Sequence, residues 1–311
     1  MPKLKIALLL GGISGEREVS LNTGAIIYDA LDKNKYEVVK YDPKTDLKKF
    51  IDDIESKKID LVFPALHGPY GEDGRLQGML DMLKVPYVFS NCLASALAMH
   101  KVKTKIIVEA AMIDTCAYAV INKNEKFNLD IIKQEIGLSL VVKPIELGSS
   151  VGISMVKDNK ELEEAIKLGF KHDKSLMLEQ FIQGRELTVA IIGKEGRGQA
   201  LPIVEIKPKI SEWFDFKAKY EAGGSEEICP AKIPGVARTE IQDLAVRAFN
   251  VIGCKDLARA DFIWVEKENK FYFLEINTIP GMTATSLAPQ AAKAAGMEFS
   301  DFLDKLIGYN V

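Results

Sequence analysis

Residues 259–277 read RADFIWVEKENKFYFLEIN, and this stretch decides what fold and chemistry to expect in the C-terminal half of the chain. The aromatic and β-branched runs at 259–265 and 271–277 predict two strands. The polar run at 266–270 between them predicts the turn of a hairpin. The register of this hairpin then determines which side chains share a face, because a slip by one residue moves every side chain to the other side.

The expected register places four polar side chains together. If the hairpin folds about its midpoint at Glu268, Asp261 lies opposite Glu275 and Arg259 lies opposite Asn277. Side chains alternate faces along a strand, so all four would project from one face near the open end of the hairpin. Two carboxylates and an amide oxygen within cross-strand reach suit Mg²⁺. We therefore predict Asp261, Glu275 and Asn277 as metal ligands, with Arg259 beside them.

The alternative is a salt-bridged hairpin end, in which Arg259 neutralises Asp261 and Glu275 pairs elsewhere. The apolar surroundings favour the metal, because buried carboxylates need a metal or a good partner. Strict alternation assigns one set of residues to the uncharged face: Ala260, Phe262, Trp264, Tyr272, Leu274 and Ile276. It assigns a second set to the charged face: Ile263, Val265, Phe271 and Phe273.

Length and composition limit the class of protein. A chain of 311 residues can bury a sizeable core and divide into two or three domains. The net charge of -3 gives no sign of a nucleic-acid or membrane-surface role. The short apolar run at 4–10 is interpreted as a first buried strand rather than a signal peptide, and no stretch approaches the ~20 apolar residues that span a bilayer.

The cysteines indicate a reduced, cytoplasmic protein. They are far apart and lack metal-ligand spacing: Cys92, Cys116, Cys229 and Cys254. For Cys229 we favour a small buried hydrophobe over a reactive thiol.

The first hundred residues alternate between strands and helices. Strands are expected at 5–10, 36–40, 61–66 and 87–89, and helices at 22–31, 47–54 and 76–83. Alternation of this kind predicts an α/β domain with a parallel sheet and helices on its faces.

Beyond residue 100 the pattern changes to α+β. Strands are expected at 117–121, 138–142, 152–156, 176–180, 186–192 and 201–206, and helices at 103–111, 160–168 and 241–252. The hairpin and two terminal helices follow. We place domain boundaries near Met99 and Gly184.

Two polar segments follow strands expected in the first sheet, at the edge where α/β folds bind ligands. LGGISGEREVS at 10–20 carries Glu16 and Glu18 near the start of a helix, where they could also be simple partners of the helix dipole. HGPYGEDG at 67–74 begins with His67, for which a hydrogen-bonded turn histidine is the favoured interpretation.

Two further segments could bind anions. KPIELGSSVG at 143–152 places Lys143 before a Gly/Ser loop whose backbone N–H groups could cover phosphates, although such a loop alone is more often a plain turn. NTIPGMTATSL at 277–287 continues directly from the metal hairpin. The Gly281 N–H and the Ser286 hydroxyl would therefore lie near the ion, available to an anion or a developing oxyanion.

Taken together, these segments resemble the D-alanine–D-alanine ligase family of the ATP-grasp superfamily. The matching stretches run in family order between residues 8 and 299 and include LLGGISGEREVSLNTG, LHGPYGEDGRLQGML, VVKPIELGSSVGIS, FKAKY and ARADF…FLEINTIPGMTATSL. Each stretch alone is modest evidence, but the ordered set covers nearly the whole chain.

The resemblance implies an N-terminal parallel α/β domain, followed by a two-part ATP-grasp fold with the nucleotide between two sheets. Residues 1–99 would bind substrate, 100–184 would form the central subdomain, and 185–311 would carry the metal and catalytic residues. ATP would phosphorylate the carboxylate of a first D-alanine, and the amine of a second D-alanine would attack the acyl phosphate. We expect a cytoplasmic homodimer that uses Mg²⁺ or Mn²⁺ in peptidoglycan precursor synthesis, without nucleic-acid or membrane partners.

The resemblance also assigns roles to residues. It implies catalytic roles for Glu16, Ser149, Tyr220, Arg259 and Gly281. It implies contacts with the substrates or the transferred phosphate for His67, Lys219, Ser286 and Leu287. It implies nucleotide contacts for Lys101, Lys143, Glu179 and Glu186. The implied metal ligands, Asp261, Glu275 and Asn277, agree with the hairpin argument.

Three departures from the family pattern are visible. His100 stands where an aspartate usually precedes Lys101, residues 145–147 replace a commoner Ser/Arg/Glu run, and Thr285 stands where histidine is frequent. Retention of Lys219 and Tyr220 favours an amine over a hydroxy acid as the nucleophile. The alternatives are a related ligase that uses D-serine or D-lactate as second substrate, and a non-catalytic nucleotide-binding regulator.

Overall fold

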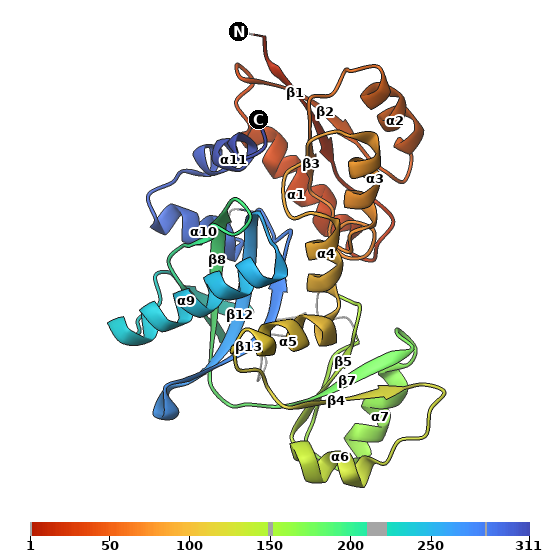
Figure 1. Ribbon diagram of the computed structural model, residues 1–311, viewed down its shortest axis with the longest axis vertical. Helices are drawn as coiled ribbons and strands as arrows, with labels where there is room; N and C mark the ends of the chain where they lie inside the picture. Colours follow the sequence, from red (N-terminus) through yellow and green to blue (C-terminus); the bar gives the residue numbers. More distant parts are fainter. Residues whose placement is uncertain (1, 149–151, 210–222, 284) are drawn as a thin grey trace.

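The structure is a computed structural model that describes residues 2–148, 152–209, 223–283 and 285–311. Within these residues, three β-sheets follow one another along the long axis of the molecule (Figure 1). The first sheet is parallel and the other two are antiparallel. This arrangement confirms the expected change from an α/β to an α+β architecture, while the domain boundaries near Met99 and Gly184 stay a prediction.

The first sheet has the order β2-β1-β3. Its elements and their helices are β1 (Leu4–Leu9), α1 (Arg17–Ala30), β2 (Tyr36–Tyr41), α2 (Leu47–Glu55), β3 (Leu61–Pro64) and α3 (Arg75–Leu83). Ile6 and Leu8 of β1 face one core and Ala7 and Leu9 face another, so both faces of the sheet are covered. The strand expected at 87–89 is wrong, because Tyr87 contributes only an isolated bridge to this sheet.

The second sheet has the order β4-β7-β5-β6 and lies at the bottom of Figure 1. This part of the chain contains α4 (Cys92–Met99), α5 (Lys101–Ala110), β4 (Tyr118–Asn122), α6 (Leu129–Ile136), β5 (Leu140–Pro144), β6 (Ser154–Val156), α7 (Asn159–Gly169) and β7 (Ser175–Gln180). Helices α4 and α6 were not predicted from the sequence. Each begins after an asparagine, Asn91 or Asn128, whose side chain accepts hydrogen bonds from the first turn, which is a recognised start signal.

The third sheet has the order β11-β10-β8-β12-β13, with β9 paired to β8. Its region contains β8 (Arg185–Gly193), β9 (Gln199–Ala200), β10 (Val204–Pro208), β11 (Ser225–Ile228), α9 (Gly235–Ile252), β12 (Asp256–Val265), the 3₁₀ turn η1 (Glu266–Glu268), β13 (Lys270–Asn277), α10 (Leu287–Ala294) and α11 (Phe299–Gly308). Helix α9 covers one face through Ile241, Ala245 and Ala248, which share a core with Val189 and Phe262.

The β12–β13 hairpin has the predicted register at its open end. Asp261 pairs with Glu275 and Arg259 pairs with Asn277. Towards the turn the pairing shifts by one residue, so that Phe262 lies opposite Phe273. Leu274 is therefore the extra residue of a β-bulge.

The bulge corrects the prediction of which side chains face the core. Phe271 and Phe273, expected on the charged face, are buried against α9. Their rings contact Trp264 and Phe262 across the hairpin, with centroid distances of 5.7 and 5.6 Å. Tyr272 was expected on the opposite face, but it pairs with the half-buried Ile263. Strict alternation failed because the extra residue reverses the faces of the strand beyond it.

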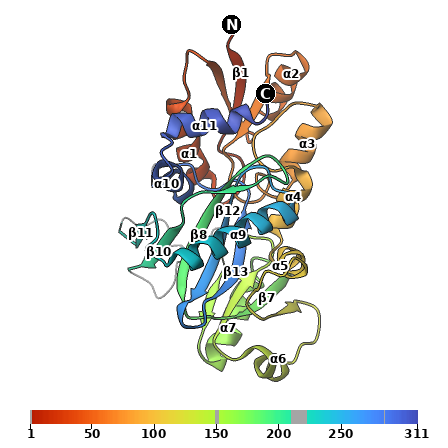
Figure 2. The ribbon, with the colours of Figure 1, turned by 60° about the vertical axis from the view of Figure 1, so that its left-hand side comes forward.

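The last helix returns to the first sheet. Phe302 and Leu306 of α11 share a hydrophobic core with Ile6 and Leu8 of β1, and α11 lies beside α1 in both Figure 1 and Figure 2. A salt bridge of 2.5 Å between Lys35 Nζ and Asp304 Oδ2 adds to this contact. The two ends of the chain therefore stabilise the same part of the molecule.

Of the four cysteines, Cys116 and Cys254 are buried, whereas Cys92 and Cys229 are half-buried. All four lie within the described residues and are free thiols. Burial raises the pKa of Cys254 to about 12 and, with the charge of Glu179, that of Cys116 to about 11. Burial also raises the pKa of the half-buried Cys229. A raised pKa keeps a thiol protonated and unreactive, which agrees with the structural interpretation of Cys229.

None of the helices in the described parts of the chain is long and apolar enough to cross a bilayer.

The loop after β1 is held by an ion pair. Arg17 Nη2 lies 2.5 Å from Asp42 Oδ2, and Arg17 Nη1 donates to the Gly12 carbonyl at 2.7 Å. Asp42 Oδ1 also accepts from the Gly12 N–H at 2.9 Å. The Arg17 hydrogen bonds, against the opposing effect of burial, lower the pKa of Asp42 from 3.8 to about 2. The pair thereby fixes the turn that leads into α1.

We expect Asp42→Asn to destabilise the protein by about 1 kcal/mol at pH 7, a value discounted for solvent screening. Folding lowers the pKa of Asp42 from 3.8 to about 2. The stabilisation from the ion pair is therefore complete when the pH is above 3.8, and it is lost as the pH falls towards 2. Urea unfolding between pH 7 and pH 2 should therefore show the difference from wild type shrinking below pH 4. The exposed Asp29→Asn on α1 is the control, and a difference independent of pH would contradict this role.

Candidate active site

A row of polar side chains crosses three neighbouring strands on the face opposite α9. Thr188 of β8 pairs with Asp261 of β12, which pairs with Glu275 of β13. In the next row, Arg259 pairs with Asn277. The bulge at Leu274 brings Glu275 and Asn277 onto this face, so the structure places all four predicted hairpin residues together.

Arg259 and Asp261 form a two-point ion pair. Arg259 Nε and Nη2 donate to the two Asp261 oxygens at 2.9 and 2.7 Å, and Thr188 Oγ1 donates to Asp261 Oδ1 at 2.5 Å. Burial works to lower the pKa of Arg259, but the charge and hydrogen bonds of Asp261 outweigh it and raise the pKa. The ion pair of the salt-bridge alternative is therefore present, and Arg259 remains a fixed positive charge beside the carboxylates.

One cavity of about 510 Å³ collects most of the predicted site residues. Its wall includes Glu16, His67, Arg259, Glu275, Asn277, Gly281, Ser286 and Leu287. A small adjoining cavity is lined by Lys101 together with Glu275 and Asn277. Residues from the first and third sheets thus enclose the same space, although Glu16 and Arg259, for example, are more than 200 positions apart in the sequence.

The wall from the first sheet is built around Glu16 and His67. A side chain at Gly68 would come within 2.6 Å of Glu16 Oε1 and one at Gly148 within 3.2 Å, so glycine lets the carboxylate lie against the backbone at both positions. The buried His67 shares a hydrogen bond of 3.1 Å with Thr23 Oγ1, and its Nδ1 is 3.8 Å from Glu72 Oε1. The expected hydrogen-bonded histidine is confirmed, and it also faces the cavity.

The opposite wall is the turn between β13 and α10. Ser286 precedes the first residue of α10 but makes no capping hydrogen bond to that helix. Its hydroxyl instead accepts from the Thr283 N–H at 3.0 Å and contacts Thr283 Oγ1 at 2.8 Å. A side chain at Gly281 would approach Ser286 Oγ to 2.9 Å, so the turn is compact at this point. The positive end of α10 faces the cavity at Leu287.

A second cluster of charges lies between α5 and the second sheet. Lys143 Nζ and Lys105 Nζ bind the two oxygens of Glu179, the latter at 2.6 Å. Lys105 is fully buried and Glu179 is 1% exposed, so this is an interior site with two cations and one anion. Lys101, one turn before Lys105 on α5, donates to the Leu147 carbonyl at 2.5 Å and lies 4.0 Å from Glu275 Oε2.

The pKa shifts in this cluster favour the charged forms. Burial opposes ionisation of Glu179, but the charges of Lys143 and Lys105 outweigh it and lower the pKa of Glu179. For Lys143 burial is again the largest effect, and Glu179 reverses it and raises the pKa of the lysine. The net positive charge of the cluster makes this interior region suited to an anion.

The remaining predicted residues fall into two groups. Glu186 lies on β8 two residues before Thr188, so it projects from the same face of the sheet, and its charge contributes to the raised pKa of Arg259. Ser149, Lys219 and Tyr220 lie outside the described residues.

The departure at His100 has a structural counterpart. His100 precedes α5, and its Nδ1 accepts a hydrogen bond of 3.3 Å from the Lys103 N–H. The ring therefore occupies the capping position that an aspartate commonly fills. The altered run at 145–147 supplies the Leu147 carbonyl to Lys101.

Sequence reasoning missed three residues of the site. Lys105 lies four residues after Lys101, a spacing that places both lysines on one face of α5 and could have been recognised. Thr188 alternates with Glu186 on β8, which is a weaker signal. Glu72 could not be found without the fold, because its approach to His67 depends on the turn after β3.

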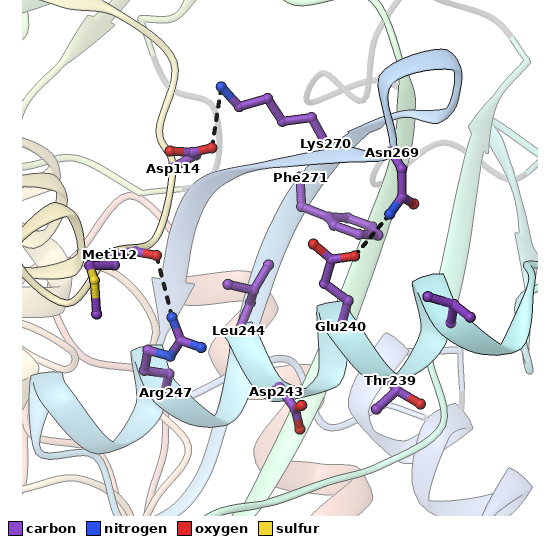
Figure 3. A pocket seen from close by; sticks show the side chains of 11 residues that line it. Met112, Asp114, Thr239, Glu240, Asp243, Leu244, Arg247, Asn269, Lys270 and Phe271 are labelled. Carbon is purple, nitrogen blue, oxygen red and sulfur yellow. Dashed lines mark hydrogen bonds and ion pairs between the residues drawn. The ribbon is translucent and has the colours of Figure 1, made fainter.

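A larger hollow of about 670 Å³ lies elsewhere, between α9 and the turn of the hairpin (Figure 3). Four of its charged residues have local partners: Lys270 pairs with Asp114, Glu240 with Asn269, and Arg247 with the Met112 carbonyl. None of the predicted site residues lines it. We therefore place the active site in the smaller cavity, where oppositely charged groups from separate sheets converge.

Two antiparallel sheets with facing lysines and carboxylates, preceded by a parallel α/β sheet, define an ATP-grasp ligase. Comparison with known sequences agrees: residues 41–90 match the family description "D-ala D-ala ligase N-terminus" and residues 107–308 match "D-ala D-ala ligase C-terminus". The chain belongs to the D-alanine–D-alanine ligase family.

Relatives and solved structures support this assignment over the full length. The D-alanine–D-alanine ligase of Pelotomaculum thermopropionicum is 45% identical over 310 residues, which cover 98% of this chain and 96% of the relative. The ATP complex of the Bacillus anthracis ligase has a TM-score of 0.84 at 34% identity, covering 98% and 96% of the two chains. VanG D-Ala:D-Ser ligase from Enterococcus faecalis has a TM-score of 0.84 at 31% identity and covers 100% of both chains.

We expect Lys105→Met to lower the free energy of unfolding by about 3 kcal/mol, because Glu179 would keep one buried partner instead of two. Chemical denaturation measures this loss. Lys103→Met, an exposed neighbour on α5, is the matched control and should change stability by less than about 0.5 kcal/mol. Equal effects of the two substitutions would contradict the proposed burial of charge.

Proposed function

We propose that this protein joins two D-alanine molecules to D-alanyl-D-alanine and converts ATP to ADP and phosphate. The observation that carries the proposal is the 510 Å³ cavity, where Glu16 and His67 face Arg259, Glu275 and Ser286. An acid for an ammonium group, a fixed guanidinium and an anion-binding turn are what two amino acids and a reacting carboxylate require. Family membership supports the same reaction.

The nucleotide would occupy the space between the second and third sheets. Lys101 and Lys143 would bind its phosphates, Glu179 would lie near adenine and ribose, and Glu186 would contact the ribose. The net positive charge around Glu179 supports phosphate binding, because Lys143 could exchange its buried partner for a phosphate while Lys105 keeps Glu179 ionised. The ATP complex of the Bacillus anthracis ligase supports the choice of nucleotide.

Asp261, Glu275 and Asn277 would hold Mg²⁺ or Mn²⁺. Among the described residues, no group of three or more His, Cys, Asp or Glu is arranged to bind a metal ion, but this set contains two carboxylates and one amide. The donors fit, since a carboxylate has about four lone-pair positions and Asp261 can accept from Arg259 and Thr188 and still bind a cation. The ion would neutralise phosphate charge during transfer.

Glu16 would bind the ammonium of the first D-alanine beside His67. Transfer of a phosphoryl group from ATP to the carboxylate of this D-alanine breaks the bond to ADP and gives an acyl phosphate. The phosphate of this acyl phosphate is the leaving group of the next step. Arg259 and the Gly281 N–H would then stabilise the tetrahedral oxyanion that forms when the second amine attacks. Arg259 can do this because Asp261 holds the guanidinium in one orientation.

The second D-alanine would place its carboxylate at Ser286 and the Leu287 N–H. The hydroxyl of Ser286 does not cap α10, which leaves the positive end of this helix directed to the cavity. Lys219 would contact the transferred phosphate, and Ser149 and Tyr220 would link Glu16 to a closing loop. Loss of phosphate from the tetrahedral intermediate completes the dipeptide.

D-serine is the second candidate for the second substrate, because the fold matches VanG D-Ala:D-Ser ligase as well as it matches a D-alanine–D-alanine ligase. We favour D-alanine on the higher identity to ligases of that name. A cytoplasmic homodimer in peptidoglycan precursor synthesis is the setting we propose for the reaction.

Purified protein with ATP and Mg²⁺ should release phosphate in response to D-alanine, and mass spectrometry should detect the dipeptide. L-alanine is the control for chirality, while D-serine and D-lactate mixed with D-alanine test the second substrate. Phosphate release with L-alanine but none with D-alanine would overturn the proposal.

We expect Glu275→Ala to lower kcat by at least about 100-fold, since the metal contributes several kcal/mol to phosphoryl transfer. Phosphate release over a range of Mg²⁺ concentrations measures the effect. Glu268→Ala, in the exposed turn of the same hairpin, should leave kcat unchanged. A near-normal rate for Glu275→Ala in folded protein would disprove its role as a ligand.

A further inference from the structure

One side chain connects the turn before α10 to strand β11. Gln290 Nε2, in the first turn of α10, donates to Glu227 Oε2 at 2.5 Å and to the Thr285 carbonyl at 2.8 Å. Both partners are pure acceptors, so the amide nitrogen must point towards them and uses both of its hydrogens. The orientation of Gln290 is therefore determined by its two partners.

Glu227 and Thr285 line the same cavity as Ser286. Within the turn, the Ser286 N–H donates to the Thr283 carbonyl at 2.9 Å and Ser286 Oγ bonds to Thr283, so Thr283 and Ser286 are linked to each other. The contact of Gln290 with Glu227 ties this linked turn to β11, the edge strand of the third sheet. The turn thereby gains a support outside its own segment.

We propose that Gln290 and Glu227 form a positioning pair that sets the place of Ser286 and so controls binding of the second amino acid. The proposal rests on the function proposed above, in which Ser286 and the Leu287 N–H receive the carboxylate of that substrate. The sequence motifs assigned no role to Gln290 or Glu227. Neither residue reacts; both act through the turn.

The charge of Glu227 gives the pair a second effect. A carboxylate in the wall of an anion-binding cavity repels the substrate carboxylate, and a neutral donor fixes the position of that charge without cancelling it. Gln290 supplies that donor, and the Ser225 hydroxyl lies 3.3 Å from the other oxygen, Glu227 Oε1. Removing Gln290 would loosen the turn and free a negative charge near it, and both changes weaken binding of the same substrate.

The test uses Gln290→Leu and Glu227→Ala in the full chain. Gln290→Leu should raise the apparent KM of the second D-alanine about tenfold, the effect of one lost charge-assisted hydrogen bond, with the KM of ATP and of the first D-alanine unchanged. Glu227→Ala loses the same bond but also removes the repelling charge, so it should raise this KM by a smaller factor. Glu227→Gln keeps an acceptor for Gln290 and should restore the KM to within twofold of wild type. Gln242→Leu, which loses a glutamine bond of 3.1 Å to the Leu201 carbonyl away from the cavity, is the matched control.

A second measurement does not depend on turnover. Hydrogen–deuterium exchange of the amides at 283–287 should be faster in Gln290→Leu than in wild type or Gln242→Leu. Unchanged exchange, or a KM change shared equally by ATP and both amino acids, would overturn the positioning role. Wild-type protein without D-alanine-dependent turnover would overturn the proposed function instead, and the exchange result would still decide whether Gln290 holds the turn.

Discussion

The proposed active site depends on Leu274, the residue of β13 that has no partner on β12. In a regular strand, residues 271, 273, 275 and 277 would all face α9, because alternate side chains share a side. Phe271 and Phe273 do face α9, and the extra residue Leu274 turns Glu275 and Asn277 to the opposite face. The hairpin can thus contribute a hydrophobic core near its turn and polar side chains at its open end. Bulges beside functional sites commonly re-aim side chains in this way.

In this hairpin and in the second sheet, side chains of opposite charge are in direct contact. Asp261 is held by Arg259 and Thr188, while Glu179 is held by two lysines. The first arrangement fixes a guanidinium beside the carboxylates, and the second leaves an excess positive charge in the interior. A polyanionic co-substrate with a divalent cation would compensate both, which is why stability and reactivity are coupled in this part of the molecule.

Local pattern predicted much of the fold and part of the site. The assumed midpoint at Glu268 gave the correct pairing of Asp261 with Glu275, because the bulge shifts the register set at the turn by one residue. Strict alternation gave the wrong face for Phe273, because it does not allow for the extra residue of the bulge. Contacts between distant segments, such as Thr23 with His67, could not be predicted because they depend on the folded chain. The N-caps Asn91 and Asn128 are recognisable in the sequence and indicate the starts of α4 and α6, which were not predicted.

The contact between β1 and α11 has a consequence for biosynthesis. Ile6 and Leu8 are made about 300 residues before Phe302 and Leu306, which cover them. During translation part of the first sheet therefore stays uncovered until α11 has left the ribosome and can dock. Exposed apolar surface on a nascent chain invites aggregation, so the interval before α11 docks is the stage at which this sheet most needs protection.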